Sequence, residues 1–540
     1  MKRRFENEYT YKRFVESGRE DEFDGLFDAA VRQAEALFGK QHPIYINGKE
    51  IYATELLVER SPINSSVTIG SFQKGTKDHA RQAVAAAKAA FASWGETDYR
   101  ERAKILRKAA EIISGEKFLL SAILSYENGK SRYESVGEVD EAIDFMHYYC
   151  DEMESNKGFS RKTSQESSTA KVSAGFQGAP SGSERVSIRM RPFGVFGVIA
   201  PFNFPVSIST GMSAAALVTG NTVVFKPSST DNMSMMTGLK LYEALKRAGI
   251  PDGVFNYVTG PGSEVGAELA INQDVSGIAF TGSGSTGMSM AAKSYANGQR
   301  KTFVVEMGGK NPAIVSKYAD LDDAVSGCAS AAFGFAGQKC SALSRVYVHS
   351  SVKEQFVSKL IDRARNFRVG NPLDKEVYIG PLISESAYKR YVQSVEHVRR
   401  TGRLLYGGDA VQTGLKGHYV QPVIAEVAHT NEIVKTELFL PFVTVEEYEK
   451  FDAALSMAND VEYGLTAALY SRNKREIKEF SERIEAGVVY INRPISATTG
   501  AIVGLHTFVG WKGSALTGKG TGSKFYLPQF MREQSLSITK

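Results

Sequence analysis

The chain has 540 residues, of which 42% are hydrophobic and 23% charged, and its formal net charge is +5 at pH 7. At roughly 150 residues per domain this length predicts about two to four domains, and so small a charge predicts neither a nucleic acid nor a membrane surface as a partner. The sequence has no secretory signal, no apolar run of about 18 residues, and no metal-ligand spacing among its three cysteines, which favours a cytoplasmic protein without a metal site.

The first third of the chain is predicted to be mainly helical. Residues 1–60 mix charged and aromatic side chains without a clear period, and we interpret them as an N-terminal arm that wraps on the body. Residues 77–117 have a helical period that breaks near Gly95, which predicts two amphipathic helices, and a third is expected within residues 136–154. Residues 157–184 are rich in Ser, Gly and Lys and poor in large apolar side chains, so a long loop or a β-flap is expected there.

From residue 190 onward, short apolar runs typical of buried strands alternate with helical stretches. The first runs are FGVFGVIAP, NTVVFKPSS, GVFNYVTG, VSGIAFTGS and KTFVVEMGG. This order predicts a mostly parallel sheet with helices on both faces, in which ligands bind at the carboxyl ends of the strands. A second alternation starts at NPAIVS and predicts a second α/β domain that ends near residue 490. The tail after residue 510 is expected to add a strand to this body or to a neighbour.

A glycine-rich run, TGSGSTG, follows one of these predicted strands and precedes a predicted helix. Gly282, Gly284 and Gly287 fit the spacing G-x-G-x-x-G, in which glycines admit a pyrophosphate close to a helix N-terminus. A plain glycine-rich turn is an equal alternative on this evidence alone. Glu306 lies 19 residues after Gly287, near the distance at which a dinucleotide site places an acidic residue on the ribose.

Cys340, in FAGQKCSALSR, is the cysteine with the most polar neighbours. An inert, packed thiol is the commoner role for a lone cysteine, whereas the charge of Lys339 would help to lower the pKa of a reactive one. No histidine stands in a motif typical of a cysteine protease. Cys150 and Cys328 lie in helical stretches and are expected to be packing residues.

Two polar side chains follow predicted strands of the first sheet. Asn203, in APFNFP, is a candidate donor to an oxyanion, with a turn former before Pro205 as the alternative. Lys226, in VVFKPSS, is placed to reach a ribose hydroxyl, with a solvated strand end as the alternative.

Five ordered segments together resemble the aldehyde dehydrogenase superfamily: VIAPFNFP, NTVVFKPSS, FTGSGSTG, VVEMGGKNPAIV and FGFAGQKCSALSR. The resemblance implies an α/β fold with a Rossmann-type NAD-binding domain, an α/β catalytic domain and a small β-flap used for oligomerisation. It assigns residues 1–156 and 190–306 to the NAD-binding domain with its N-terminal arm, 307–488 to the catalytic domain, and 157–189 and 489–540 to the flap and C-terminal segment. A homo-oligomer, a dimer or larger, is expected.

The resemblance also implies a role for each candidate residue. Cys340 attacks an aldehyde, Asn203 and the Cys340 backbone N–H hold the oxyanion, and Glu306 activates the water that hydrolyses a thioester. Partial burial is expected to raise the pKa of Glu306. The cofactor is expected to be NAD, although Ser229, where an acidic residue often follows the Lys-Pro pair, leaves NADP open. The implied cofactor contacts are Ala200, Pro201, Phe202, Lys226, Ser228, Gly282, Ser283, Gly287, Glu437 and Phe439.

Three further segments resemble those dehydrogenases of the superfamily that act on 1-pyrroline-5-carboxylate, the cyclic form of glutamate 5-semialdehyde: EAIDFMHYY, KCSA and TTGAIVG. This resemblance implies oxidation of a small-molecule semialdehyde to glutamate in proline degradation. It places Ser341 and the backbone N–H groups of Gly500 and Ala501 on the substrate α-carboxylate, and Glu141 opposite its ammonium group. A solvated helix position is the alternative for Glu141.

Two segments depart from the pattern of the superfamily. Leu440, in ELFLP, stands where glycine is usual, and TFVGWKGSA replaces the usual segment at Thr507–Ala515. A reshaped backbone near the nicotinamide is therefore expected. The alternatives are a dehydrogenase of another semialdehyde or plain aldehyde, and a catalytically silent binding protein of the same fold.

Overall fold

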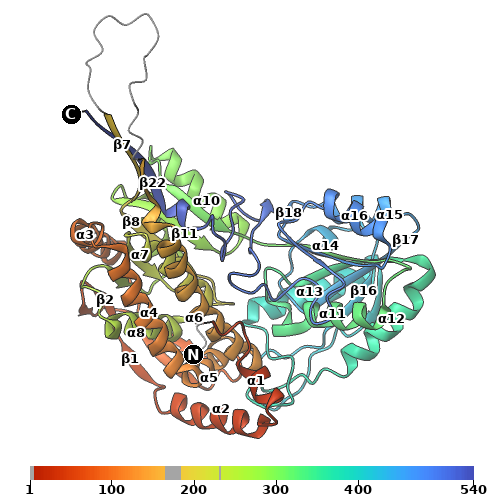
Figure 1. The fold of residues 1–540 in the computed structure, drawn as a ribbon. Helices are drawn as coiled ribbons and strands as arrows, with labels where there is room; N and C mark the ends of the chain where they lie inside the picture. Colours follow the sequence, from red (N-terminus) through yellow and green to blue (C-terminus); the bar gives the residue numbers. More distant parts are fainter. Residues whose placement is uncertain (1–4, 164–183, 230–232, 540) are drawn as a thin grey trace, which may run out of the picture.

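The computed structural model describes residues 5–163, 184–229 and 233–539. Its main body has two lobes, each built on a seven-stranded sheet, which lie side by side in Figure 1. The helices and parallel strands confirm the predicted α/β class. Among the described helices, none combines the length and the apolar character needed to cross a bilayer.

The first sheet has the strand order β12-β11-β8-β9-β10-β2-β3. Its first five strands are parallel, and the hairpin of β2 and β3 joins the edge in antiparallel fashion. Four of the five predicted strands end on polar or glycine-rich loops, so the carboxyl edge collects the candidate residues. The bounds are β2 Ile44–Ile46, β3 Lys49–Ile51, β8 Val195–Ile199, β9 Thr222–Lys226, β10 Phe255–Tyr257, β11 Val275–Thr281 and β12 Thr302–Glu306.

Helices cover both faces of this sheet because its strands are apolar on both sides. One face packs against α3, α9 and α10, and the other against a thicker layer that includes α4 to α8. The two amphipathic helices predicted before and after Gly95 are α3 and α4, and the third predicted helix is α6. The bounds are α3 Lys77–Trp94, α4 Tyr99–Gly115, α5 Lys117–Asn128, α6 Arg132–Ser155, α7 Ser207–Val218, α8 Met235–Ala248, α9 Ala267–Ile271 and α10 Gly284–Ala296.

The second sheet has the order β15-β16-β17-β14-β13-β19-β20 and is parallel except at β15. Helices α11, α12 and α13 pack on one face, and α15 and α16 on the other. The strand bounds are β13 Asn311–Val315, β14 Leu343–His349, β15 Arg403–Tyr406, β16 Val423–Glu426, β17 Phe442–Tyr448, β19 Thr466–Tyr470 and β20 Val488–Ile491. The helix bounds are α11 Leu321–Phe333, α12 Ser350–Arg365, α13 Glu385–Thr401, α14 Glu432–Lys435, α15 Phe451–Asn459 and α16 Lys474–Arg483.

Three smaller sheets complete the described chain. The largest is an antiparallel sheet of order β22-β7-β6 that projects from the body in Figure 1 and carries the C-terminus. The predicted tail strand is therefore β22, whereas most of the predicted flap, residues 164–183, lies outside the described residues. The bounds are β6 Ser160–Thr163, β7 Glu184–Pro192, β22 Met531–Thr539, β1 Lys40–His42, β4 Leu56–Arg60, β5 Thr68–Gln73, β18 Tyr463–Gly464 and β21 Trp511–Lys512.

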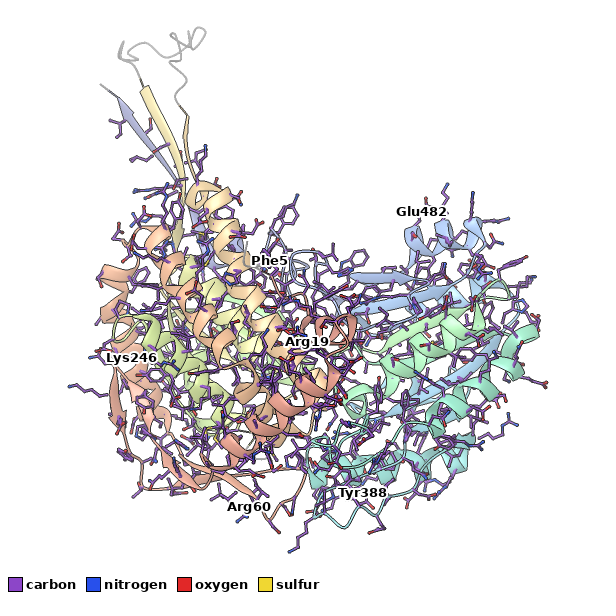
Figure 2. All side chains as sticks on the ribbon, turned by 60° about the horizontal axis from the view of Figure 1, so that its bottom comes forward. Phe5, Arg19, Arg60, Lys246, Tyr388 and Glu482 are labelled. Carbon is purple, nitrogen blue, oxygen red and sulfur yellow. The ribbon has the colours of Figure 1, made fainter. Side chains whose placement is uncertain are left out.

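The prediction that residues 1–60 lack a period is wrong. They contain α1 (Thr10–Glu16) and α2 (Glu20–Glu35), and α2 buries Phe23, Phe27 and, one turn further, Ala30 and Ala34. This spacing is helical, but charged side chains at most other positions of α2 obscure it. Figure 2 shows that Phe5 and Arg19, which flank α1, lie near the junction of the two lobes.

Candidate active site

Cys340 lies in a short, rigid loop between α11 and β14. The loop passes through a 3-10 turn, Gly334–Gly337, and a Cβ on Gly337 (φ +67°) would stand 2.1 Å from the carbonyl oxygen of Leu440. Asn311 donates to the carbonyl oxygens of Cys340 and Ala342 at 2.8 and 2.9 Å. The same amide accepts from the Thr466 backbone N–H at 3.0 Å, so the next strand of the sheet fixes the position of the thiol.

The thiol opens into a cavity of about 100 Å³ between the lobes. Residues from distant parts of the chain form its wall, and several were predicted as site residues on other grounds. The lining residues are Glu8, Glu141, Phe145, Phe204, Ile208, Met212, Thr281, Glu306, Cys340, Ser341, Gly500, Ala501, Phe508 and Thr521. The structure thus brings together Cys340, Glu306 and the predicted substrate residues in one place.

The surroundings of Cys340 do not favour a thiolate when the cavity holds no ligand. Burial, followed by the negative charges of Glu437 and Glu306, raises the pKa of the thiol to about 12. The backbone N–H groups of Ser341 and Cys340 lower the pKa, but by less than these causes raise it. Lys339 pairs with Glu134 of α6 at 2.6 Å instead. The hypothesis that Lys339 lowers the pKa of the thiol is therefore wrong, because its charge is engaged by a carboxylate on another element.

The other two cysteines are packing residues, as predicted. Cys328 is fully buried in α11, and burial raises the pKa of its thiol. Cys150 is fully buried in α6, where its thiol donates to the Ala103 carbonyl oxygen at 3.5 Å.

Glu306 is the last residue of β12 and faces the cavity of the thiol. It is 9% exposed, and its Oε2 atom has no hydrogen-bond partner among the described residues. Burial raises its pKa well above the ordinary range, with only the Gly510 backbone acting in the opposite direction. This agrees with the predicted direction. A carboxylate with this pKa, beside a thiol, suits a general base better than a ligand of a ribose.

The Asn203 amide reaches the thiol loop from the first sheet. It follows β8, is 4% exposed, and its Nδ2 donates to the Gln338 carbonyl oxygen at 3.1 Å. Lys130 donates to the Asn203 carbonyl oxygen from below the loop. The side chain is thus held against the thiol loop, two residues before Cys340, and does more than form a turn.

The glycine-rich run forms a strand, a turn and a helix N-terminus. Helix α10 begins at Gly284, and the Ser283 hydroxyl caps it by accepting from the Thr286 backbone N–H at 3.3 Å. A Cβ on Gly287 would stand 3.0 Å from the Met307 sulfur, so glycine is required for close packing there. A Cβ on Gly284 would have only the Tyr463 hydroxyl near it, at 4.0 Å, so this turn is open.

Lys226 ends β9 as a buried cation, so the alternative of a solvated strand end is wrong. Its ammonium group donates to the Pro227 carbonyl oxygen at 3.1 Å and to the Ser229 hydroxyl at 3.3 Å. Burial lowers its pKa to about 8, and no carboxylate of the described residues opposes this shift. Ser228, beside it, is also buried. Buried donors without a carboxylate fit the hydroxyl groups of a nucleotide.

The second lobe faces Lys226 and the glycine-rich turn with two of the implied cofactor residues, Glu437 and Phe439. The Glu437 carboxylate accepts from the Gly309 backbone N–H at 2.9 Å, and burial raises its pKa. The Phe439 ring packs edge-on against Phe202, which follows Ala200 and Pro201 after β8, at 5.9 Å between centroids. The ten implied cofactor residues therefore surround the mouth of the first sheet from both lobes.

The two unusual segments keep their places at the site. The left-handed backbone falls on Phe439 (φ +59°) and not on Leu440, which is buried in the core of the second lobe, so position 440 does not require glycine. Ser514, within Thr507–Ala515, accepts from the Met307 backbone N–H at 2.8 Å and donates to the Gly308 carbonyl oxygen at 2.7 Å. The segment thus remains attached to the end of β12 beside Glu306.

The predicted substrate residues share the cavity with the thiol. Arg493 donates to the Thr499 and Gly500 carbonyl oxygens at 2.6 and 2.7 Å, which fixes the loop that carries Gly500 and Ala501. Ser341 is attached to the same loop because the Thr498 hydroxyl donates to its carbonyl oxygen at 2.7 Å. Glu141 faces the cavity from α6, and burial, followed by the charge of Glu8, raises its pKa to about 8, so a solvated helix position does not describe it.

Sequence reasoning missed part of the cavity wall. Phe145 lies one helical turn after Glu141, so the period of α6 was a usable signal for it. Phe204 and Ile208 follow Asn203 closely in the sequence, so the prediction of Asn203 was a usable signal for them too. No local signal marks Glu8 or Phe508, because they reach the cavity only through the folded chain.

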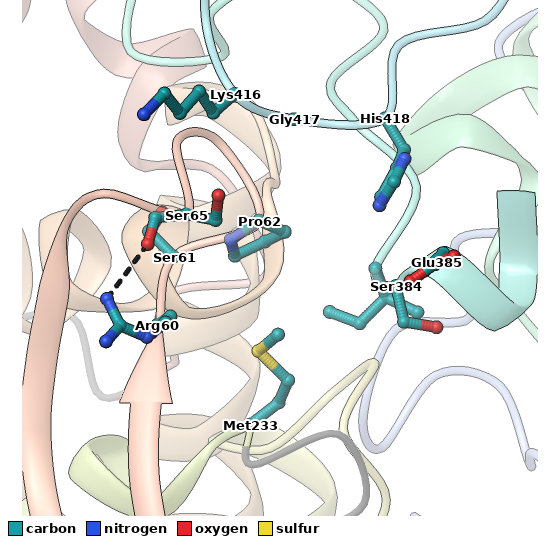
Figure 3. Close-up of a pocket in the computed structure, with 11 residues that line it drawn as sticks. Arg60, Ser61, Pro62, Ser65, Met233, Ser384, Glu385, Lys416, Gly417 and His418 are labelled. Carbon is teal, nitrogen blue, oxygen red and sulfur yellow. Dashed lines mark hydrogen bonds between the residues drawn. The ribbon is translucent and has the colours of Figure 1, made fainter.

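A second, wider hollow of about 640 Å³ lies between β4 and the N-terminus of α13 (Figure 3). Arg60, Lys416 and His418 stand around it, and Ser384 and Glu385 border it from α13. It contains no cysteine, and none of the predicted site residues lines it. The cavity of Cys340 is therefore the better candidate for catalysis.

Comparisons with known proteins show the family of the chain. The sequence model of the Aldehyde dehydrogenase family matches residues 53–536. A 1-pyrroline-5-carboxylate dehydrogenase of Geobacillus sp. (strain WCH70) is 36% identical over 517 residues, which cover 95% of each chain. A second relative with the name 1-pyrroline-5-carboxylate dehydrogenase 1, from Halalkalibacterium halodurans, is also 36% identical, over 95% of each chain.

Solved structures give the same result. The R100A mutant of Thermus thermophilus 1-pyrroline-5-carboxylate dehydrogenase has a TM-score of 0.86 and 32% identity, over 95% of this chain and 96% of that one. A Thermus 1-pyrroline-5-carboxylate dehydrogenase with bound NAD matches with the same TM-score, identity and coverage. On these matches and on the site they accompany, the chain belongs to the aldehyde dehydrogenase family.

Proposed function

We propose that this protein oxidises L-glutamate 5-semialdehyde, the open form of 1-pyrroline-5-carboxylate, to L-glutamate with NAD, as a step of proline degradation. The observation that carries the proposal is the shared cavity of Cys340 and Glu306, whose wall also holds Ser341, Gly500 and Ala501. The names of the relatives support the substrate, and the Thermus structure with bound NAD supports the cofactor.

The described residues fit a dinucleotide. Lys226 and Ser228 are buried donors for ribose hydroxyl groups, and the open turn at Ser283 offers the N-terminus of α10 to a pyrophosphate. Glu437 and Phe439 border the place expected for the nicotinamide ribose and ring. When bound, NAD supplies the acceptor for the hydride that leaves the substrate carbon. Ser229 places no negative charge beside Lys226, so NADP is tested alongside NAD.

Cys340 is the proposed nucleophile. Its sulfur forms a bond to the aldehyde carbon, and the carbonyl oxygen becomes an oxyanion in a thiohemiacetal. The Asn203 amide and the Cys340 backbone N–H donate to that oxyanion. Because the cavity raises the pKa of the free thiol to about 12, a proton has to leave the sulfur as it attacks, and Glu306 is the carboxylate of the cavity wall that can accept it.

Glu306 is the proposed base for the second half of the reaction. Its unpartnered Oε2 accepts a proton from water, and the water oxygen attacks the thioester carbon. The carbon–sulfur bond then breaks, which releases the carboxylate product and restores the cysteine. Burial raises the pKa of Glu306 well above the ordinary range, so hydrolysis is expected to slow as the pH falls, because less of the base is then ionised.

Two parts of the cavity wall match the two charged groups on the α-carbon of the proposed substrate. The Ser341 hydroxyl and the backbone N–H groups of Gly500 and Ala501 are donors for the α-carboxylate, and Arg493 fixes their loop from behind. Glu141 is an acceptor for the α-ammonium group. The aldehyde, at the other end of the substrate, then has to reach Cys340 in the same cavity.

We also propose a homo-oligomer and the division into domains implied by the resemblance. Residues 1–156 with 190–306 form the NAD-binding part and residues 307–488 the catalytic part. The exposed strands β7 and β22, from residues 157–189 and 489–540, form the contact between subunits. The two sheets and the projecting β22-β7-β6 sheet support this division.

The experiment measures reduced nicotinamide with purified protein, 1-pyrroline-5-carboxylate and either NAD or NADP. Wild type is expected to turn over, and Cys340→Ala to lose activity on the order of a thousandfold or more. Glu306→Gln is expected to slow the first burst of reduced cofactor and to lower steady turnover about a hundredfold or more, because both the attack of Cys340 and the hydrolysis need the base. Cys328→Ala is the control and is expected to keep its activity.

Three results would contradict the proposal. Wild type that oxidises no aldehyde with either cofactor contradicts the enzymatic function. Faster oxidation of plain aliphatic aldehydes than of the semialdehyde contradicts the proposed substrate. Turnover that survives Cys340→Ala contradicts the mechanism.

A further inference from the structure

The N-terminal segment 5–9, which precedes α1, reaches the cavity of Cys340 and contributes one side chain to its wall. That side chain is the carboxylate of Glu8. The segment lies on the same helix, α6, that carries Glu141. Glu8 and Glu141 are 133 residues apart in the sequence (141 − 8), so only the fold brings the two carboxylates together.

Two aspartates of α6 hold this segment in place. The two carboxylate oxygens of Asp144 accept from the backbone N–H groups of Glu6 and Asn7, both at 2.7 Å. Asp140 accepts from the Thr10 hydroxyl at 2.8 Å and pairs with Lys117 at 2.5 Å. The chain is therefore fixed on both sides of Glu8.

The backbone between these anchors is strained in a way that aims Glu8. Asn7 and Glu8 have φ values of +53° and +54°, and neither is a glycine. Two successive left-handed residues of this kind are costly, roughly 1–2 kcal/mol each, and persist only where surrounding contacts enforce them. Here the Asp144 bonds enforce them, and the resulting turn directs Glu8 toward the cavity.

The wall of α6 leaves room for Glu8. Its Oε2 atom lies 4.0 Å from the position that a Cβ would take on Gly137, one helical turn before Glu141. Burial raises the pKa of Glu8 to about 7, against the charges of Lys339 and Arg493, and no hydrogen bond or ion pair engages its carboxylate among the described residues. The neighbouring Glu6, in contrast, pairs with Arg13 at 2.7 Å. Glu8 is thus a carboxylate held in the cavity without a hydrogen-bond partner of its own.

We infer that Glu8 is a specificity-determining residue, which together with Glu141 forms a cation-binding end of the cavity and selects aldehydes that carry an ammonium group. This inference rests on the proposed function and adds to it the part of the enzyme that distinguishes an amino acid semialdehyde from other acidic aldehydes. Burial, followed by the charge of Glu8, raises the pKa of Glu141, and a cation between the two carboxylates removes the part that is due to Glu8. Ser341, Gly500 and Ala501, on the wall of the same cavity, hold the carboxylate on the same carbon.

The test compares two substrates that differ in one group. L-Glutamate 5-semialdehyde carries the α-ammonium group, and glutarate semialdehyde has the same chain and carboxylate without it. For Glu8→Gln we expect kcat/KM for the first to fall about tenfold or more, mainly through KM, because a charge-assisted hydrogen bond is lost. For glutarate semialdehyde we expect no loss. Glu16→Gln, an exposed carboxylate on α1 near Lys12, is the matched control and is expected to match wild type with both substrates.

A binding measurement separates specificity from folding. With wild type, L-glutamate is expected to inhibit more strongly than glutarate, and with Glu8→Gln this preference is expected to shrink about tenfold while glutarate binding and the melting temperature stay the same. Glu8→Asp, which keeps the charge, is expected to retain part of the preference.

Equal losses on both substrates, or an unchanged ratio between them, would overturn the role of Glu8. These outcomes are distinct from failure of the proposed function, in which wild type itself does not oxidise the semialdehyde. A Glu8→Gln protein with a lower melting temperature and equal losses on both substrates would make Glu8 a structural residue only.

Discussion

At the scale of single residues, the site depends on groups that the fold brings next to Cys340. Lys339 is its neighbour in the sequence but pairs with Glu134, whereas Glu437, nearly 100 residues later, acts on the thiol directly. The net result is a thiol held in its neutral form. Such a thiol resists oxidation and alkylation until a ligand changes its surroundings.

We therefore expect Cys340 of the free protein to react slowly with iodoacetamide. From neutral pH to about pH 9, the rate of this reaction should rise about tenfold per pH unit, because only the thiolate reacts. Glu437→Gln removes the negative charge that, after burial, does most to raise the pKa of the thiol, so its rate at a fixed pH should exceed that of wild type.

The measurement is mass spectrometry of peptides, with buried Cys150 and Cys328 as internal references. Glu447→Gln, an exposed position on β17, is the control and should leave the rate unchanged. A rate that levels off near pH 8, or one that is unchanged by Glu437→Gln, would contradict the account of the thiol.

Much of the site could be predicted at this scale, and its limits have a physical cause. Short motifs carry Cys340, Glu306 and Asn203 because each lies at the end of a strand or in a loop next to one, where the topology of a parallel sheet fixes which residues meet. Glu8 and Phe508 could not be predicted in this way, because their place in the cavity depends on long-range contacts such as the anchors on Asp144. The charge state of Lys339 likewise depends on a partner from α6.

At the scale of elements, the N-terminus of α8 is held by two buried carboxyl groups. Glu59, from β4, accepts from the backbone N–H groups of Met235 and Met236 at 3.0 and 3.1 Å, and Glu127, from α5, accepts from that of Thr237 at 3.0 Å. Burial and the proximity of the two groups raise the pKa of Glu59 well above its usual range, and burial raises that of Glu127 to about 7. The pair is most stable with one proton bound.

This pair predicts a pH dependence of stability. Because the folded pKa of Glu127 exceeds its ordinary value of 4.5, the folded protein holds the proton more tightly, and the resulting stability is present at low pH and lost as the pH rises through about 7. Glu127→Gln cannot ionise, so between about pH 5 and pH 8 its melting temperature should fall by roughly 2–4 °C less than that of wild type.

The control is Glu243→Gln on the same helix, whose carboxylate pairs with Lys240 at the surface. Its melting temperature should follow that of wild type across the pH range. An equal pH slope for Glu127→Gln and wild type would show that the proton is not shared by Glu59 and Glu127.

Most elements of both sheets could be predicted from the sequence, and α2 could not. Strands such as β8 and β13 are apolar on both faces and stand out as short continuous runs. Helix α2 has only four buried side chains, and charged residues occupy many of its other positions. The helical period of its apolar residues is therefore hard to recognise in the sequence. The sequence left open whether β22 pairs with a strand of its own chain, as it does with β7, or with a strand of another chain. The residues of a strand are the same in both cases.

At the scale of the whole molecule, the projecting sheet presents unfinished edges. β22 pairs with β7 along nine positions, and β6 pairs with the opposite edge of β7. Among the described strands, β22 therefore has one edge without a partner strand. Leu536 and Ile538 are 39% and 49% exposed on this strand, and Ile188 of β7 is 37% exposed. Free edges with exposed apolar side chains favour association with another chain.

We expect Leu536→Glu with Ile538→Glu to shift the protein from an oligomer to a monomer, because both side chains lie on one face of β22 and the change places charge there. Light scattering after size exclusion measures the mass. Ser535→Glu with Ser537→Glu, on the opposite face of the same strand, adds the same charge and should keep the oligomer. A wild type that is already monomeric, or equal masses for both double variants, would contradict this interface.

The cavity of Cys340 takes its wall from both ends of the chain: Glu8 at one end, and Gly500, Phe508 and Thr521 at the other. During synthesis, therefore, the first and the last contributors are separated by almost the entire time of translation. A growing chain has no complete cavity until residue 521 has been added and folded into place. Substrate can stabilise only the finished protein, and abundance in the cell should respond to it through protection of completed chains rather than through assistance to their folding.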